Sequence, residues 1–83
     1  MDTIARTAKQ LGAAFRRFRR QKDLTQRTLG GLMHARQATI SKLESGEPGV
    51  QLRVLIDALT ALDLELVVRP RTKAPANQIE DLF

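Results

Sequence analysis

Cysteine, tryptophan and tyrosine are absent from this chain of 83 residues, and its only aromatic residues are three phenylalanines. Without cysteine, the chain can form neither a disulfide scaffold nor a cysteine-ligated zinc site. Its core must therefore be built mainly from Leu, Ile, Val and Ala. The length suits one domain with one modest core, and cores of this size often gain stability by dimerisation.

Long apolar runs are missing as well. No stretch approaches the roughly 20 apolar residues that span a membrane, and residues 1–6 lack the apolar segment of a signal peptide. We therefore expect a cytoplasmic protein that does not act on membranes. Catalysis is not expected, because Ser41 and Ser45 have no base to activate them and no glycine-rich phosphate loop is present. We also expect no metal and no cofactor.

Positive charge is concentrated in the first half of the chain, although the net charge is only +5. Residues 1–42 contain ten Lys and Arg against two acidic residues, whereas residues 43–83 contain four against seven. This asymmetry indicates one surface that faces a polyanion and a second surface with another role. A solvated basic face without any ligand would give the same counts.

Four segments have the apolar spacing of amphipathic helices, which predicts a mostly α domain. The first runs over residues 7–22, with apolar positions spaced 3, 4 and 3 residues apart. Thr25 is a suitable N-cap for a second helix that ends near Met33. Residues 37–45 and 51–62 are expected to form the third and fourth helices.

A tight turn is expected between the second and third helices. His34 begins it, and histidine is enriched among residues that adopt a positive φ. As the only histidine, it is a poorer candidate for a ligand or an acid–base group. Gly30 and Gly31 each cost the second helix about 1 kcal/mol relative to alanine. A close helix crossing would explain Gly30, whereas nothing in the sequence explains Gly31.

After the fourth helix the apolar period changes from helical to alternating, which predicts a short strand over residues 64–69. A lone strand is unstable, so the same strand of a second subunit is its simplest partner. The domain would thus cover residues 1–69, and residues 70–83 would form a flexible tail with an apolar and acidic end. The residues expected to mediate dimerisation are Leu64, Leu66, Val67 and Val68.

The two central helices have residue types that suit a helix-turn-helix, in which the second helix enters the major groove of DNA. Glutamine can pair with an adenine edge and arginine with a guanine edge, while a methyl group can touch thymine. Ser41 is small enough to approach a base or a phosphate. Around the amino end of the first of these helices, Thr25, Gln26 and Arg27 can bind phosphate.

The segments Leu24-Thr25-Gln26, Leu29-Gly30 and 37–46 resemble the Xre and λ-repressor/Cro-like helix-turn-helix family, and within it the HipB-like antitoxins. The resemblance covers roughly residues 11–62. HipB-like antitoxins share the Gln-Ala-Thr-Ile-Ser segment, a strand that pairs between subunits and an apolar, acidic tail. Two residues depart from the pattern of this family: His34 stands where glycine is usual, and Leu32 stands where a polar residue is usual.

This resemblance implies a homodimer that binds a palindromic operator in double-stranded DNA, represses its own operon and associates with a HipA-like Ser/Thr kinase toxin. It implies a four-helix domain with a C-terminal strand shared between subunits, located with the nucleoid. By position, the residues that would read bases are Arg36, Gln37, Ala38 and Ser41. Those that would contact phosphate are Thr25, Gln26, Arg27, Thr39 and Lys42.

Three other interpretations of the sequence remain open. One is a free-standing Xre/Cro-type repressor without a toxin partner. Another is a module that binds only protein, through its helical face and tail. A third treats Phe15 and Phe18, together with the neighbouring arginines, as the two faces of a helix on a membrane surface.

Overall fold

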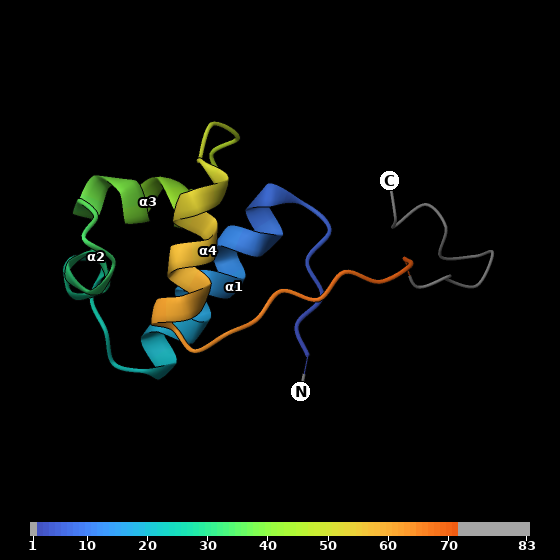
Figure 1. Ribbon diagram of the computed structural model, residues 1–83, viewed down its shortest axis with the longest axis horizontal. Coiled ribbons are helices and arrows are strands. Elements are labelled where there is room, and N and C mark those ends of the chain that lie inside the picture. The colour runs from blue at the N-terminus through green and yellow to red at the C-terminus, as the bar shows by residue number, and fades with distance from the viewer. Residues whose placement is uncertain (1, 72–83) are drawn as a thin grey trace.

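Four helices form one bundle in the computed structural model, which describes residues 2–71. They are α1 (Ala8–Gln21), α2 (Gln26–Met33), α3 (Gln37–Ser45) and α4 (Leu52–Ala61). In Figure 1, α2 and α3 lie at one end of the molecule, while residues 2–6 and 64–71 extend toward the other end. The predicted mostly α, four-helix domain is confirmed.

Polar caps fix where the first two helices begin. The Thr7 hydroxyl accepts a hydrogen bond of 3.0 Å from the backbone N–H of Gln10, and the Thr25 hydroxyl accepts one of 3.0 Å from Thr28. Each bond satisfies one of the N–H groups that a helix leaves unpaired in its first turn. The predicted N-cap role of Thr25 is therefore confirmed.

Left-handed residues end α2 and α3. His34 has φ 54° and ψ 40°, and Gly46 has φ 77° and ψ 31°. The positive φ expected at His34 is confirmed, so the turn forms without a glycine at this position. The backbone N–H of Ala35 then donates a 2.8 Å hydrogen bond to the carbonyl oxygen of Gly30, which closes the turn before α3.

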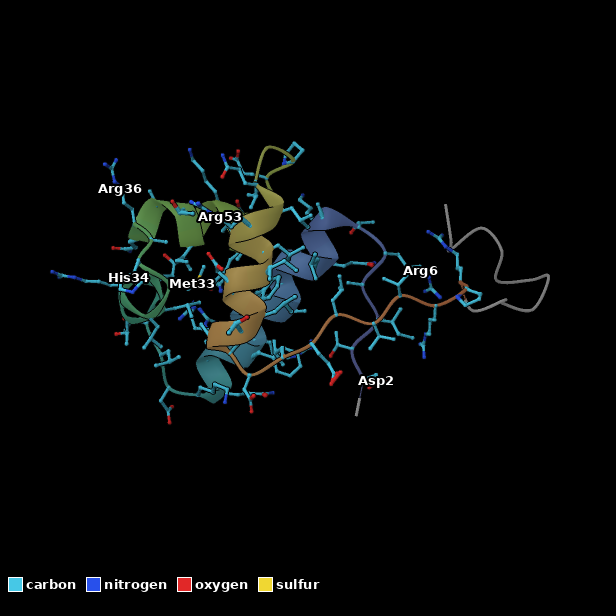
Figure 2. The ribbon with its side chains drawn as sticks, in the orientation of Figure 1. Asp2, Arg6, Met33, His34, Arg36 and Arg53 are labelled. Carbon is cyan, nitrogen blue, oxygen red and sulfur yellow. The ribbon has the colours of Figure 1, made fainter. Side chains whose placement is uncertain are left out.

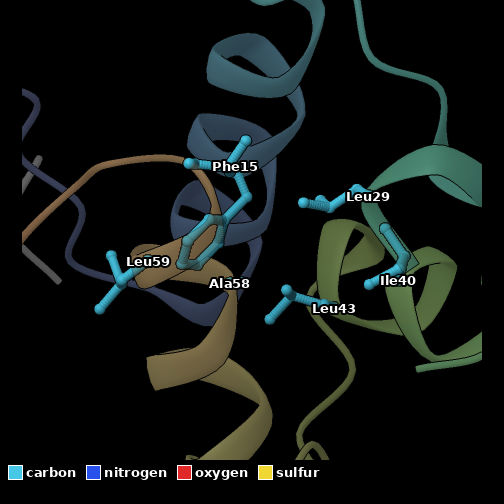
Figure 3. Packing of buried hydrophobic residues seen from close by; sticks show 7 residues of the cluster. Phe15, Leu29, Ile40, Leu43, Ala58 and Leu59 are labelled. Carbon is cyan, nitrogen blue, oxygen red and sulfur yellow. The ribbon is translucent and has the colours of Figure 1, made fainter. Parts of the chain in front are cut away.

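The core lies where the helices meet and is almost wholly aliphatic around a single buried ring. Phe15 is 2% exposed and is surrounded by side chains from the other three helices, as Figure 3 shows. Its fully or nearly buried neighbours are Leu29, Ile40, Leu43, Ala58, Leu59 and Leu62. Since Phe18 also packs against this cluster, α1 presents no large apolar face for a membrane surface. No helix within residues 2–71 is long and apolar enough to cross a membrane.

Two glycines allow close backbone approaches. A Cβ atom on Gly12 would lie 2.6 Å from the carbonyl oxygens of Leu43 and Glu44, so α1 and α3 cross there in direct backbone contact. A Cβ on Gly30 would lie 2.6 Å from the carbonyl oxygen of Ala35. The close contact expected at Gly30 is therefore made by the turn that follows α2, and the predicted crossing helix is wrong.

Residues 64–69 form no strand with any other segment of the described chain. They follow α4 without regular secondary structure and run beside the N-terminal segment, residues 2–6 (Figure 1). Both segments line one groove together with α1 and the end of α4. Pairing between two subunits requires a second chain, so the predicted intersubunit strand stays a prediction. The tail beyond residue 71 lies outside the described residues.

The two glycines Gly12 and Gly31 provide a matched test of the packing. Gly12→Ala should lower the free energy of unfolding by about 1–3 kcal/mol, because the new methyl group would push α1 away from α3. Gly31→Ala should raise it by about 1 kcal/mol, because nothing lies within 4 Å of that position and alanine favours the helix. Urea denaturation of both variants measures the two changes, and a stabilised Gly12→Ala variant would contradict the crossing described here.

Candidate nucleic-acid interface

The amino end of α3 presents the four predicted base-reading residues to solvent. Arg36 is the N-cap residue and makes no side-chain cap bond, so its guanidinium is free to reach outward. Gln37, Ala38 and Ser41 are exposed in the first turns of α3. Figure 2 shows Arg36 and His34 at one end of the molecule, with Arg6 at the opposite end. The structure therefore brings these four residues together on one accessible edge.

The predicted phosphate-contacting residues differ in how accessible their side chains are to a phosphate. Arg27 and Lys42 are exposed, as is Thr25, but the Thr25 hydroxyl is already occupied by the N–H and hydroxyl of Thr28. Thr39 is half-buried on the side of α3 away from Gln37. The Thr25 hydroxyl is thus used to cap α2. The backbone N–H groups in the first turn of α2 are better placed than this hydroxyl to bind an anion.

A buried ion pair supports this edge from beneath. The Arg19 guanidinium in α1 donates two hydrogen bonds to the Glu44 carboxylate in α3, with Nε to Oε2 at 2.6 Å and Nη2 to Oε1 at 3.0 Å. Its third contact is a 2.7 Å bond from Nη1 to the carbonyl oxygen of Leu24, just before α2. One side chain therefore ties together α1, α3 and the entry to α2.

Burial makes this pair sensitive to substitution. The side chains of Arg19 and Glu44 are 8% and 3% exposed. The hydrogen bonds to Glu44 raise the pKa of the Arg19 guanidinium above its usual value, and burial opposes that rise. Removing one partner from such a pair leaves an uncompensated charge in the interior, which is costly.

Two glutamines extend the network to the exposed edge. The Gln26 side chain in α2 donates a 3.2 Å bond from Nε2 to Oε1 of Glu44, and its own carbonyl oxygen lies 3.5 Å from Nε2 of Gln37. The second contact is long for a hydrogen bond. It therefore orients the Gln37 side chain without holding it firmly. Gln26, predicted as a phosphate contact, acts here as a positioning residue between the interior and a predicted base reader.

Sequence reasoning assigned no role to Arg19 and Glu44, although their positions carried a signal. Arg19 follows Phe15 by four residues, and Glu44 follows Ile40 by four, so each charged residue stands on the inward stripe of its helix. A charge at a core position needs a partner of opposite sign. Arg19 is the only inward-facing cation of α1, and Glu44 is the only acidic residue of α3, so within these two helices each could pair only with the other.

We expect Arg19→Ala to lower the free energy of unfolding by about 3–5 kcal/mol, because Glu44 would remain buried without its cation. The double variant Arg19→Met with Glu44→Leu should recover most of that loss, because two apolar side chains need no pairing. Thermal unfolding followed by circular dichroism compares the two proteins. If the double variant were no more stable than Arg19→Ala, burial of an unpaired charge would not be the cause.

Comparison with known proteins agrees with this geometry. A family model described as a helix-turn-helix domain matches residues 10–71. Two solved structures, a HipB–O4 20mer complex and a HipA–HipB–O2–O3 complex, contain chains that are 26% identical to this one, with a TM-score of 0.77; each match covers 87% of this chain and 100% of the other.

A second type of regulator is also similar. The clp gene regulator ClgR from C. glutamicum is 33% identical, with a TM-score of 0.61, and the match covers 77% of this chain and 80% of that one. None of the curated proteins is significantly similar in sequence. Since the matched range includes nearly all of α1 and the whole of α2, α3 and α4, this chain belongs to the helix-turn-helix domain family.

Proposed function

We propose that this protein is a sequence-specific DNA-binding regulator that inserts the amino end of α3 into the major groove. The observation that carries the proposal is the exposed edge of Arg36, Gln37, Ala38 and Ser41, with Gln37 held 3.5 Å from Gln26. A reading side chain needs access to base edges, which all four residues have, and it gains from a restricted direction, which the neighbouring Gln26 gives to Gln37. The proposal assigns no enzymatic reaction to the chain.

Each exposed residue has a chemical role in this proposal. The Gln37 amide can donate to and accept from an adenine edge, and the Arg36 guanidinium can pair with guanine. The methyl group of Ala38 can lie against a thymine methyl, and the Ser41 hydroxyl can bond to either a base or a phosphate. Arg27 and Lys42 supply the charge that holds the backbone on either side.

We further propose an autorepressing antitoxin with a HipA-like kinase toxin as its partner. Support comes from the solved HipB structures, one of which is the HipA–HipB–O2–O3 complex. The second candidate is a free-standing repressor, which the greater identity with ClgR favours. A protein kinase that copurifies with the full chain from its native host would decide for the antitoxin, and its consistent absence would decide for the repressor.

Dimerisation belongs to the same proposal, because a palindromic operator matches a two-fold protein. Residues 64–69 are the proposed contact. Three apolar side chains of this segment are open to solvent: Leu66 is 53% exposed, Val67 66% and Val68 90%. Leu64 is half-buried against the core and anchors the segment to its own subunit. Pairing with a second copy would cover this apolar surface.

Binding to duplex DNA tests the main proposal. A duplex selected by the full chain from a random pool should be bound with an affinity that falls steeply as salt rises. Gln37→Ala should cost about 1–3 kcal/mol at one base position and relax the preference there. Lys42→Ala should weaken binding to all sequences equally and reduce the salt slope by about one for each bound subunit.

Fluorescence anisotropy with the selected duplex and with variants at each base pair measures these effects. A Gln37→Ala loss that is the same for every sequence would argue against base reading by that residue. Absence of any duplex binding at low salt would remove the proposed function altogether and leave a module that binds only protein.

A second experiment tests the dimer. Leu66→Pro should disrupt dimerisation, because proline has no N–H to donate to a strand ladder. Leu66→Ala is the matched control, since it also removes the leucine side chain but keeps the N–H. Analytical ultracentrifugation should show monomers for the proline variant and a larger dimer fraction for the alanine variant; a fully dimeric Leu66→Pro protein would refute the shared strand.

A further inference from the structure

A shallow basic depression on the outer face of α1 is not accounted for by the proposed edge of α3. It is lined by five residues of α1 and one of α3, namely Ala13, Arg16, Arg17, Arg20, Gln21 and Glu44. None of the five α1 residues was predicted to contact bases or phosphates. The depression therefore needs an explanation of its own.

The positive charge of this depression is not neutralised within residues 2–71. The Glu44 carboxylate lines it, but both oxygens are already engaged, Oε2 by Arg19 and Oε1 by Arg19 and Gln26. No acidic residue occurs in α1. Arg16 and Arg20 make no hydrogen bond or ion pair with another residue of that part of the chain, and their spacing of four places two like charges side by side. An anionic ligand would relieve this repulsion.

Arg17, the third cation of the depression, already has partners. Its Nη2 donates a 2.8 Å hydrogen bond to the hydroxyl of Thr3, and its guanidinium lies 5.5 Å from the centre of the Phe18 ring. It therefore secures the N-terminal segment against α1. Arg16 and Arg20 are the two cations that remain available for an external anion.

The depression adjoins the proposed DNA-binding edge on the side of α2. Glu44 connects the two, because it lines the depression and also accepts the hydrogen bond from Gln26, whose carbonyl oxygen lies 3.5 Å from Nε2 of Gln37. The carboxyl end of α1, where Arg20 stands, leads within five residues to the N-cap of α2 at Thr25. A DNA backbone that meets the first turn of α2 would therefore continue toward Arg16 and Arg20.

We infer that Arg16 and Arg20 bind backbone phosphates that flank the bases read by α3, so that the DNA contact extends onto the outer face of α1. This inference rests on the proposed function. A lipid surface fits the depression less well, because Ala13 is the only apolar residue in its lining and both phenylalanines of α1 pack toward the core.

Salt-dependent binding of single variants tests the inference. Each lost phosphate contact lowers the salt slope by about 0.9, which corresponds to roughly an eightfold loss of affinity at 0.1 M salt and to almost none near 1 M. Arg16→Ala and Arg20→Ala should each show this change once for every subunit bound to the selected duplex, and therefore twice for a dimer. Arg6→Ala removes the same charge at the opposite end of the molecule and should leave the slope unchanged (Figure 2).

Direct contact is separated from long-range attraction by changing the DNA. A duplex with uncharged methylphosphonate linkages outside the base-read positions should bind the parent protein with the reduced slope. The double variant Arg16→Ala with Arg20→Ala should lose nothing further on that duplex. An additional loss there would show attraction at a distance and overturn the inference.

The remaining outcomes are also decisive. Equal slopes for the parent protein, Arg16→Ala and Arg20→Ala would place the depression off the DNA while leaving the proposed function intact. If the parent protein bound no duplex at all, the proposed function itself would fail. Binding to vesicles of anionic lipid that disappears in the double variant, with DNA affinity unchanged, would reassign the depression to a membrane surface.

Discussion

The hydrogen-bonded pair of Arg19 and Glu44 is the constraint on which the arrangement of α1, α2 and α3 depends. Two charges in a nearly closed interior are tolerable only when each satisfies the other, and here the guanidinium meets both carboxylate oxygens and one backbone carbonyl. Aliphatic packing alone would allow neighbouring helices to slide by a fraction of a turn. A paired charge fixes one relative position, because any slide breaks directional bonds.

This constraint acts together with a purely steric one. At Gly12 the backbones of α1 and α3 are in contact, with no room for a side chain between them. Close approach at that point brings Arg19, seven residues along α1, within reach of Glu44. The small residue sets the separation of the two helices, and the ion pair sets their rotation.

Much of the fold could be predicted from local sequence signals. The spacing of apolar residues located all four helices, and Thr25 marked the start of α2. Histidine is one of the few residue types besides glycine that adopt a positive φ, and this predicted the left-handed turn at His34. These features are encoded within a few residues of one another. The exposed edge of α3 followed from the same local pattern, since the residues that read bases must stand at the start of a helix and face away from its apolar stripe.

What could not be predicted depends on contacts between distant segments. The link from Glu44 through Gln26 to Gln37 joins residues 18 and 11 positions apart, and nothing in the local pattern of either glutamine shows which partner it will find. Gly30 is a different case, because its close neighbour is the carbonyl of Ala35, only five residues along the chain, and that contact is made by the turn at His34 and not by another helix. The pairing of residues 64–69 is harder still to predict from the sequence, because it requires a contact with a second molecule.

The contact between Gln26 and Gln37 has a consequence for the entropy of recognition. A glutamine side chain that must be immobilised on binding loses rotamer freedom worth on the order of 1–2 kcal/mol. Gln37 has part of that freedom removed while the protein is alone, through a neighbour that is itself anchored to a buried carboxylate. Part of the cost of ordering this side chain is thus met during folding, so less of it remains to be met when Gln37 binds a base.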